Sequence, residues 1–104
     1  MSEVLVVIVQ FSTVVGRRDE ALEVLRPVIE QIQAEEGCLL YALHEGDEGD
    51  FTFIQKWASK SDADRHGQSS PVQPILAEKL GPLVQGPPVI TELQPIPVSS
   101  KGTL

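Results

Sequence analysis

The sequence predicts an α+β fold of the ferredoxin-like kind, with its elements in the order β-α-β-β-α-β. Three observations lead to this prediction. Residues 4–11, VLVVIVQF, are almost continuously apolar and rich in β-branched side chains, which is typical of a strand buried on both faces. Residues 17–35 place apolar side chains at helical spacing. Residues 38–58 contain two strand-like runs around the turn GDEGD, which predicts a β-hairpin.

The first helix and the hairpin have clear limits in the sequence. Pro27 lies inside the helix predicted over residues 17–35 and is expected to bend it, because its ring clashes with the preceding turn. Gly37 is a natural stop after this helix. The hairpin strands are expected over residues 38–45 and 51–58.

Two helical pieces are expected after the hairpin. The first covers about residues 61–66, with Ser61 as a possible N-cap and Gly67 as its stop. The second begins at the sequence SSP, where Ser70 can cap the helix and Pro71 suits its first position. Its apolar face consists of Val72, Ile75, Leu76 and Leu80.

The last strand is expected over residues 89–96, which completes a four-stranded antiparallel sheet with helices on one face. A chain of 104 residues has the length of one domain. We assign residues 1–97 to this domain and residues 98–104 to a C-terminal tail.

Charge and cysteine content restrict the partners and the compartment. The net charge of −7 argues against nucleic acid and against anionic membrane surfaces. The single cysteine, Cys38, cannot form an internal disulfide, which fits a reducing compartment. The N-terminus has the features of neither a signal peptide nor a membrane span. We therefore expect a cytoplasmic protein.

The predicted sheet has apolar side chains on both faces, although helices cover only one. In the first strand, Val4, Val6 and Ile8 alternate with Leu5, Val7, Val9 and Phe11. A large uncovered apolar face is uncommon in monomers. We therefore expect a homodimer through the sheet faces. The alternative is that the C-terminal tail folds over its own sheet.

Several stretches of the chain resemble the antibiotic biosynthesis monooxygenase family. The stretches are EEGCLLYALHE, FTFIQKW, DADRH and GPPVITELQPI, and the resemblance covers roughly residues 4–97. It implies a dimeric α+β barrel with a pocket between helices and sheet in each subunit. Some members of the family oxygenate aromatic phenols or quinols with O₂ and need neither metal nor flavin, so we expect no cofactor. Other relatives degrade haem or process small signalling molecules.

Two positions depart from the family pattern. Gln55 stands two residues before the tryptophan, where the family often has glutamate, and this removes a possible charged partner for His66. The haem-degrading relatives use an asparagine on the first strand, where this chain offers only Gln10. Haem chemistry is therefore disfavoured.

The candidate pocket residues begin with the return strand of the hairpin. Phe53, Gln55 and Trp57 alternate and so share one face. Two aromatic walls with an amide between them suit a flat phenolic ligand. The indole N–H of Trp57 is a candidate donor to an oxyanion. In the alternative interpretation, both rings only pack in the core.

His66 is the candidate general base, because imidazole exchanges protons near neutral pH. Asp62 precedes it by one helical turn and is expected to orient the ring. Tyr41 is expected to add a hydroxyl to the pocket or to pack in the dimer. The alternative for His66 is a solvated histidine on a polar helix. His44 and Cys38 give no metal-ligand spacing with it, so no metal site is predicted.

The sequence thus favours a cofactor-independent monooxygenase that acts on a small quinol or phenol. Two alternatives remain at this stage. One is another small-molecule enzyme of the same fold, such as an isomerase or a haem-degrading enzyme. The other is a non-catalytic, ligand-binding dimer.

Overall fold

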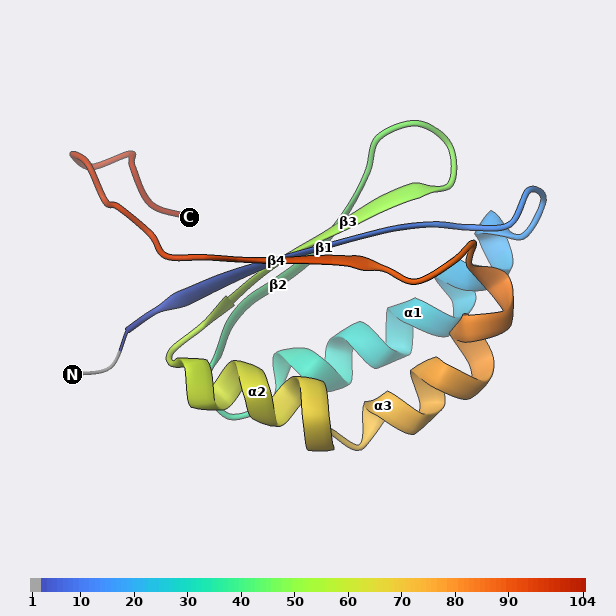
Figure 1. The fold of residues 1–104 in the computed structure, drawn as a ribbon, viewed down its shortest axis with the longest axis horizontal. Helices are drawn as coiled ribbons and strands as arrows, with labels where there is room; N and C mark the ends of the chain where they lie inside the picture. Colours follow the sequence, from blue (N-terminus) through green and yellow to red (C-terminus); the bar gives the residue numbers. More distant parts are fainter. Residues whose placement is uncertain (1–2) are drawn as a thin grey trace.

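The computed structural model describes residues 3–104 and confirms the predicted β-α-β-β-α-β arrangement (Figure 1). The elements are β1 (Leu5–Ser12), α1 (Arg18–Gln33), β2 (Cys38–Glu45), β3 (Asp50–Trp57), α2 (Lys60–Ser69), α3 (Val72–Ile75), the π-helical segment η1 (Leu76–Leu80), the 3₁₀ turn η2 (Gly81–Leu83) and β4 (Val89–Leu93). The sheet has the order β2-β3-β1-β4, and all its neighbouring strands are antiparallel. Over the described residues, the sheet does not close on itself.

The hydrophobic core lies between the sheet and the helices, which all lie on one face of the sheet (Figure 1). The strands contribute alternate residues such as Leu5, Val7 and Trp57, and α1 contributes a stripe at helical spacing. That stripe consists of Ala21, Leu25, Val28 and Ile32, which are all buried. α1 continues through Pro27, so the predicted helix is a single element.

α2 begins earlier and ends later than predicted. Ser59, and not Ser61, is its N-cap, because the Ser59 Oγ accepts a hydrogen bond of 3.1 Å from the backbone N–H of Asp62. The helix continues through Gly67, which it tolerates without a stop, and ends at Ser69. The Ser70 Oγ then accepts a hydrogen bond of 3.3 Å from the N–H of Val72. The next helix begins at Val72, so Pro71, and not Ser70, is at the N-cap position, one residue later than predicted.

A β-bulge in β2 changes which residues face the helices. Cys38 pairs with Trp57, but Leu40 pairs with Lys56, so Leu39 is the extra residue. If side chains alternated strictly along this strand, Cys38 and Leu40 would lie on the same face of the sheet. The bulge instead brings Cys38 to the helix face and leaves the side chain of Leu39 55% exposed.

The sheet has a second face, the open face, which points away from the helices. Its apolar centre consists of Val6, Ile8, Leu40, Ala42 and Ile54. The C-terminal tail returns to one part of this face, where the Lys56 Nζ donates a hydrogen bond of 2.9 Å to the carbonyl of Leu104. The apolar side chains of the tail, Ile96, Val98 and Leu104, nevertheless remain exposed.

No helix within residues 3–104 is long and apolar enough to cross a membrane.

Candidate active site

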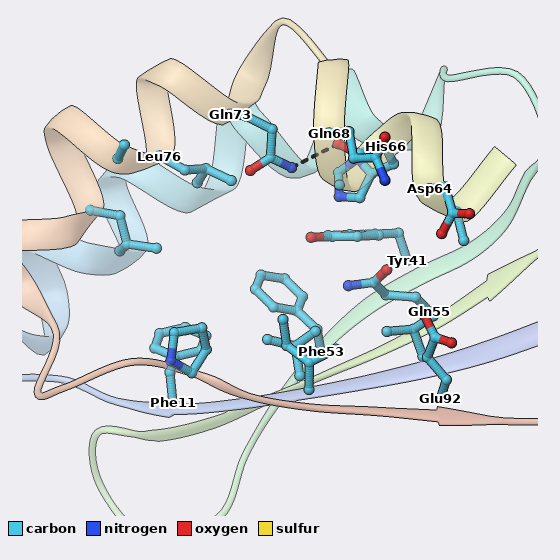
Figure 2. A pocket seen from close by; sticks show the side chains of 18 of the residues that line it. Phe11, Tyr41, Phe53, Gln55, Asp64, His66, Gln68, Gln73, Leu76 and Glu92 are labelled. Carbon is cyan, nitrogen blue, oxygen red and sulfur yellow. Dashed lines mark hydrogen bonds between the residues drawn. The ribbon is translucent and has the colours of Figure 1, made fainter. Parts of the chain in front are cut away.

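A cavity of about 560 Å³ lies between the sheet and the wall formed by α2, α3 and η1. This volume lies within the range of small-molecule sites. One part of its lining is apolar and includes Val7, Val9, Phe11, Phe53, Leu76 and Leu80. The polar part consists of Tyr41, Gln55, Asp64, His66, Gln68, Gln73 and Glu92. Figure 2 shows Tyr41, Phe53 and Gln55 facing the helical wall that carries His66.

His66 is buried in the last turn of α2 and is held by a carboxylate from another element. Its Nδ1 lies 3.0 Å from Oε1 of Glu35, in the turn after α1. The Ser70 Oγ donates to the other oxygen of Glu35 at 2.5 Å. Because a carboxylate only accepts hydrogen bonds, Nδ1 carries a proton, and in the neutral ring the lone pair is therefore on Nε2. This arrangement gives the cavity a proton acceptor.

Two aromatic rings fix the plane of this imidazole. The Trp57 indole stacks on it, with ring centroids 5.0 Å apart, and Tyr41 meets it edge-on at 5.6 Å. The Gln73 Nε2 donates a hydrogen bond of 2.8 Å to the backbone carbonyl of His66. The ring is therefore positioned by two aromatic contacts and through its backbone.

Trp57 does not line the cavity, contrary to its predicted role. The indole is 0% exposed, and its Nε1–H donates a hydrogen bond of 2.9 Å to Oε1 of Gln55. Because an indole has only one N–H, none is left for an oxyanion in the cavity. Trp57 supports Gln55 and His66, which are the residues that do line the cavity.

Asp62 does not orient His66, so this part of the prediction is wrong. One carboxylate oxygen of Asp62 accepts from Arg65 at 2.8 Å, and the other accepts from the Ser59 Oγ at 2.9 Å. These hydrogen bonds, that of Ser59 first, lower the pKa of Asp62. Asp62 thus stabilises the start of α2, while the carboxylate on His66 comes from Glu35.

Tyr41 supplies a phenol to the cavity. Its ring packs on Phe53 with centroids 4.8 Å apart, and its hydroxyl points into the open space (Figure 2). Burial raises the pKa of Tyr41, and nearby Cys38 and Glu35 add to this effect. The phenol therefore stays protonated at neutral pH and acts as a hydrogen-bond donor.

Two carboxylates, Asp64 and Glu92, lie together at one end of the cavity (Figure 2). Lys60 bridges them, with its Nζ 3.1 Å from Asp64 and 3.4 Å from Glu92. Lys60 itself does not line the cavity, and no arginine or lysine does among the residues that the structure describes. Within residues 3–104 there is also no group of three or more metal-binding side chains.

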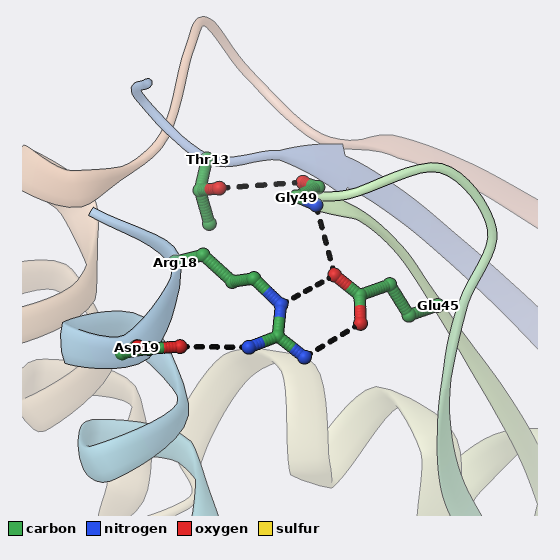
Figure 3. A network of polar contacts seen from close by, with 5 residues as sticks. All are labelled: Thr13, Arg18, Asp19, Glu45 and Gly49. Carbon is green, nitrogen blue, oxygen red and sulfur yellow. Dashed lines mark hydrogen bonds and ion pairs between the residues drawn. The ribbon is translucent and has the colours of Figure 1, made fainter. Parts of the chain in front are cut away.

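A second polar network joins the start of α1 to the β2–β3 hairpin (Figure 3). Arg18 forms two hydrogen bonds with Glu45, at 2.7 and 2.8 Å, and a third with Asp19 at 2.7 Å. The N–H of Gly49 donates to the same carboxylate of Glu45 at 2.9 Å. These contacts, that of Arg18 first, lower the pKa of Glu45 to about 2. None of these residues lines the cavity, so the network supports the fold.

Solved structures with the same fold cover nearly the whole chain. Rv0793 from Mycobacterium tuberculosis is 28% identical, covers 93% of this chain and 99% of its own, and has a TM-score of 0.82. PA3566 from Pseudomonas aeruginosa is 26% identical, covers 92% and 97% respectively, and has a TM-score of 0.82. A Caulobacter crescentus protein described as an antibiotic biosynthesis monooxygenase has a TM-score of 0.83 over 91% of this chain and 92% of its own. At 22% identity, that likeness shows the fold alone.

Comparison at the level of sequence identifies the family. No curated protein matches the chain with significance. Residues 4–77 match the sequence profile described as antibiotic biosynthesis monooxygenase. Because this match covers most of the chain and includes His66, Gln55 and Tyr41, the protein belongs to the antibiotic biosynthesis monooxygenase family.

Proposed function

We propose that this protein is a cofactor-independent monooxygenase that acts on a small, aromatic quinol or phenol with O₂. The observation that carries the proposal is the His66–Glu35 pair at the polar end of a cavity with aromatic side chains in its lining. We expect a flat ring to lie against Phe53, with its hydroxyl directed to His66 at the polar end of the cavity. Family membership supports the reaction type, and the side chains of this chain support the substrate class.

The proposed chemistry begins with a proton transfer. Nε2 of His66 takes the hydroxyl proton, and the carboxylate of Glu35 stabilises the imidazolium that forms. The resulting phenolate is electron-rich enough to reduce O₂ directly. For a quinol, one oxygen atom enters the ring and the other leaves in water, so that quinol and O₂ give a hydroxyquinone and water. The substrate supplies all the electrons.

Proton transfer without oxygenation is the second candidate, because the His66–Glu35 pair would serve an isomerase equally well. Haem degradation has less support. Gln10, at the place of the asparagine in haem-degrading relatives, pairs with Thr52 and Val89 in the sheet and does not line the cavity.

The experiment is O₂ uptake with a panel of quinols and phenols, comparing the wild type with His66→Gln. Loss of the base is expected to lower the rate by about 10²- to 10⁴-fold. His44→Gln is the matched control, because the other histidine is exposed on β2 and does not line the cavity. O₂ uptake that persists in His66→Gln would remove this residue from the mechanism. Substrate proton exchange without O₂ uptake would favour the isomerase.

We also propose that two chains form a homodimer through the open face. Its apolar centre contains Ile8 and Ile54, which are only partly buried in the single chain, and the exposed side chains of β4, Val89 and Leu93, extend it. Pairing two such faces removes apolar surface from water, at about 25 cal/mol per Å². The cavity lies on the other side of the sheet, so each chain keeps its own site.

Sedimentation equilibrium at micromolar concentration tests this assembly. We expect about twice the mass of the 11.3 kDa chain, and a shift toward the single-chain mass in Ile8→Lys. A wild type that sediments as a single chain contradicts the dimer, and the tail contact at Lys56 is then the better account of the open face.

A further inference from the structure

We propose that the cavity holds its ligand as an oxyanion that forms in place, bound by the Nε2 amide of Gln55 and the hydroxyl of Tyr41. The ligand enters uncharged and loses a hydroxyl proton to Nε2 of His66, so that an O–H bond breaks and an N–H bond forms. This inference rests on the proposed function in taking His66 as the base, but it does not require that O₂ reacts afterwards.

The orientation of the Gln55 amide is fixed by its neighbour. Trp57 can only donate, so the amide atom that faces its Nε1–H at 2.9 Å must be the oxygen. The NH₂ group then lies on the other side, and Figure 2 shows this end of Gln55 pointing into the cavity. Gln55 is only 4% exposed. Within residues 3–104, no protein group accepts a hydrogen bond from this NH₂ group.

Tyr41 gives the cavity a second donor of the same kind. The residue is 5% exposed, and its hydroxyl has no hydrogen-bond partner in the part of the chain that the structure describes. Because burial raises the pKa of Tyr41, the hydroxyl keeps its proton. Two donors that face the cavity and have no acceptor among the described residues, beside a proton acceptor on the neutral ring of His66, are the groups that an oxyanion needs as it forms.

The charges around the cavity indicate that the anion is made inside it. Asp64 and Glu92 at one end share the single ammonium group of Lys60, which leaves this end with a net negative charge, and the described lining offers no arginine or lysine to pair with an incoming anion. The chain as a whole also carries a net charge of −7. Carboxylated or phosphorylated ligands are therefore repelled, whereas an uncharged aromatic hydroxyl compound is admitted. The proposed substrates are therefore restricted to phenols and quinols without a charged substituent.

The substitution that tests the two proposed donors, Gln55 and Tyr41, is Gln55→Glu, which keeps the shape of the side chain. A glutamate can still accept from Trp57, but it presents an acceptor to the cavity in place of a donor. Gln31→Glu is the charge-matched control, because Gln31 is exposed on α1 and does not line the cavity. Thermal unfolding checks that each variant is folded.

The readout is the acidity of a bound nitrophenol, followed by its phenolate absorbance as pH is varied, with no turnover and no O₂. We expect the wild type and Gln31→Glu to lower the pKa of the bound probe below its value in water. In Gln55→Glu the acid constant of the bound probe should fall by about tenfold or more. Equal acidities in the wild type and Gln55→Glu, or no binding of the probe to the wild type, would overturn the inference.

A second arm compares methyl 4-hydroxybenzoate with 4-hydroxybenzoate by calorimetry. The uncharged ester should bind the wild type about tenfold or more tightly than the carboxylate. Equal or tighter binding of the carboxylate contradicts the charge argument. Failure of the oxygenase proposal is distinguishable, because it would appear as absence of O₂ uptake in a protein that still lowers the pKa of the bound nitrophenol.

Discussion

Single residues in this protein act mainly through the neighbours that orient them. Trp57 is the clearest example, because it is fully buried but determines which end of the Gln55 amide the cavity receives. Glu35 likewise positions His66 and is itself held by Ser70. Neither Trp57 nor Glu35 lines the cavity. The chemistry of the site therefore depends on supporting residues as much as on those that meet a ligand.

The ion pair of Glu45 with Arg18 predicts a pH-dependent stability. These contacts lower the pKa of Glu45 from 4.5 to about 2 in the folded protein. A carboxyl whose pKa is lower in the folded state stabilises that state above the unfolded pKa, and this contribution disappears as pH falls. The urea midpoint of the wild type should exceed that of Glu45→Gln near pH 6, and the two should converge between pH 4.5 and 2. A difference that stays constant over this range would contradict the pairing.

The helical periodicity of α1 indicates the position of Glu35, although no local sequence motif does. The buried stripe of α1 includes Leu25, Val28 and Ile32, and Glu35 continues the same spacing one turn further. This phase directs Glu35 inward. Its partner His66 lies 31 residues away in the sequence, so the contact itself is a product of the tertiary fold. Asp62 was the wrong choice because its place three residues after Ser59 suits the start of the helix better.

At the level of elements, the start of α2 matters because this helix carries His66. Ser59→Ala removes the side chain that accepts from the N–H of Asp62 and should lower the free energy of unfolding by about 1 kcal/mol. Ser61→Ala is the matched control, because Ser61 is exposed inside the helix, and its effect should stay within about 0.5 kcal/mol. Urea denaturation of both variants measures this. A larger loss in Ser61→Ala would reverse the assignment of the cap.

Hydrophobic periodicity predicts the order of the strands and helices but not the irregularity in β2. Strand and helix order follow from hydrophobic periodicity, and five of the predicted segments lie within a few residues of β1, α1, β2, β3 and β4. The bulge at Leu39 does not follow from periodicity, because its side chain fits either alternation. The extra residue reverses the facing of Cys38, and only the pairing with β3 reveals it.

For the whole molecule, the two faces of one sheet have separate roles in this account. The helix face encloses the cavity with His66 and Gln55, and the open face is apolar at its centre, where we propose that a second copy binds. Family membership fixes the arrangement of layers. Gln55 lines the cavity at a position where this chain departs from the family pattern, and we propose that it helps to determine which ligand binds.

The most direct test of the central claim is a crystal structure of the protein with an uncharged quinol, prepared without O₂. The ring should lie in the cavity against Phe53, with one hydroxyl facing His66 and an oxygen about 3 Å from Nε2 of Gln55. A quinol that binds only outside the cavity, or with its oxygens turned away from both His66 and Gln55, would contradict the account.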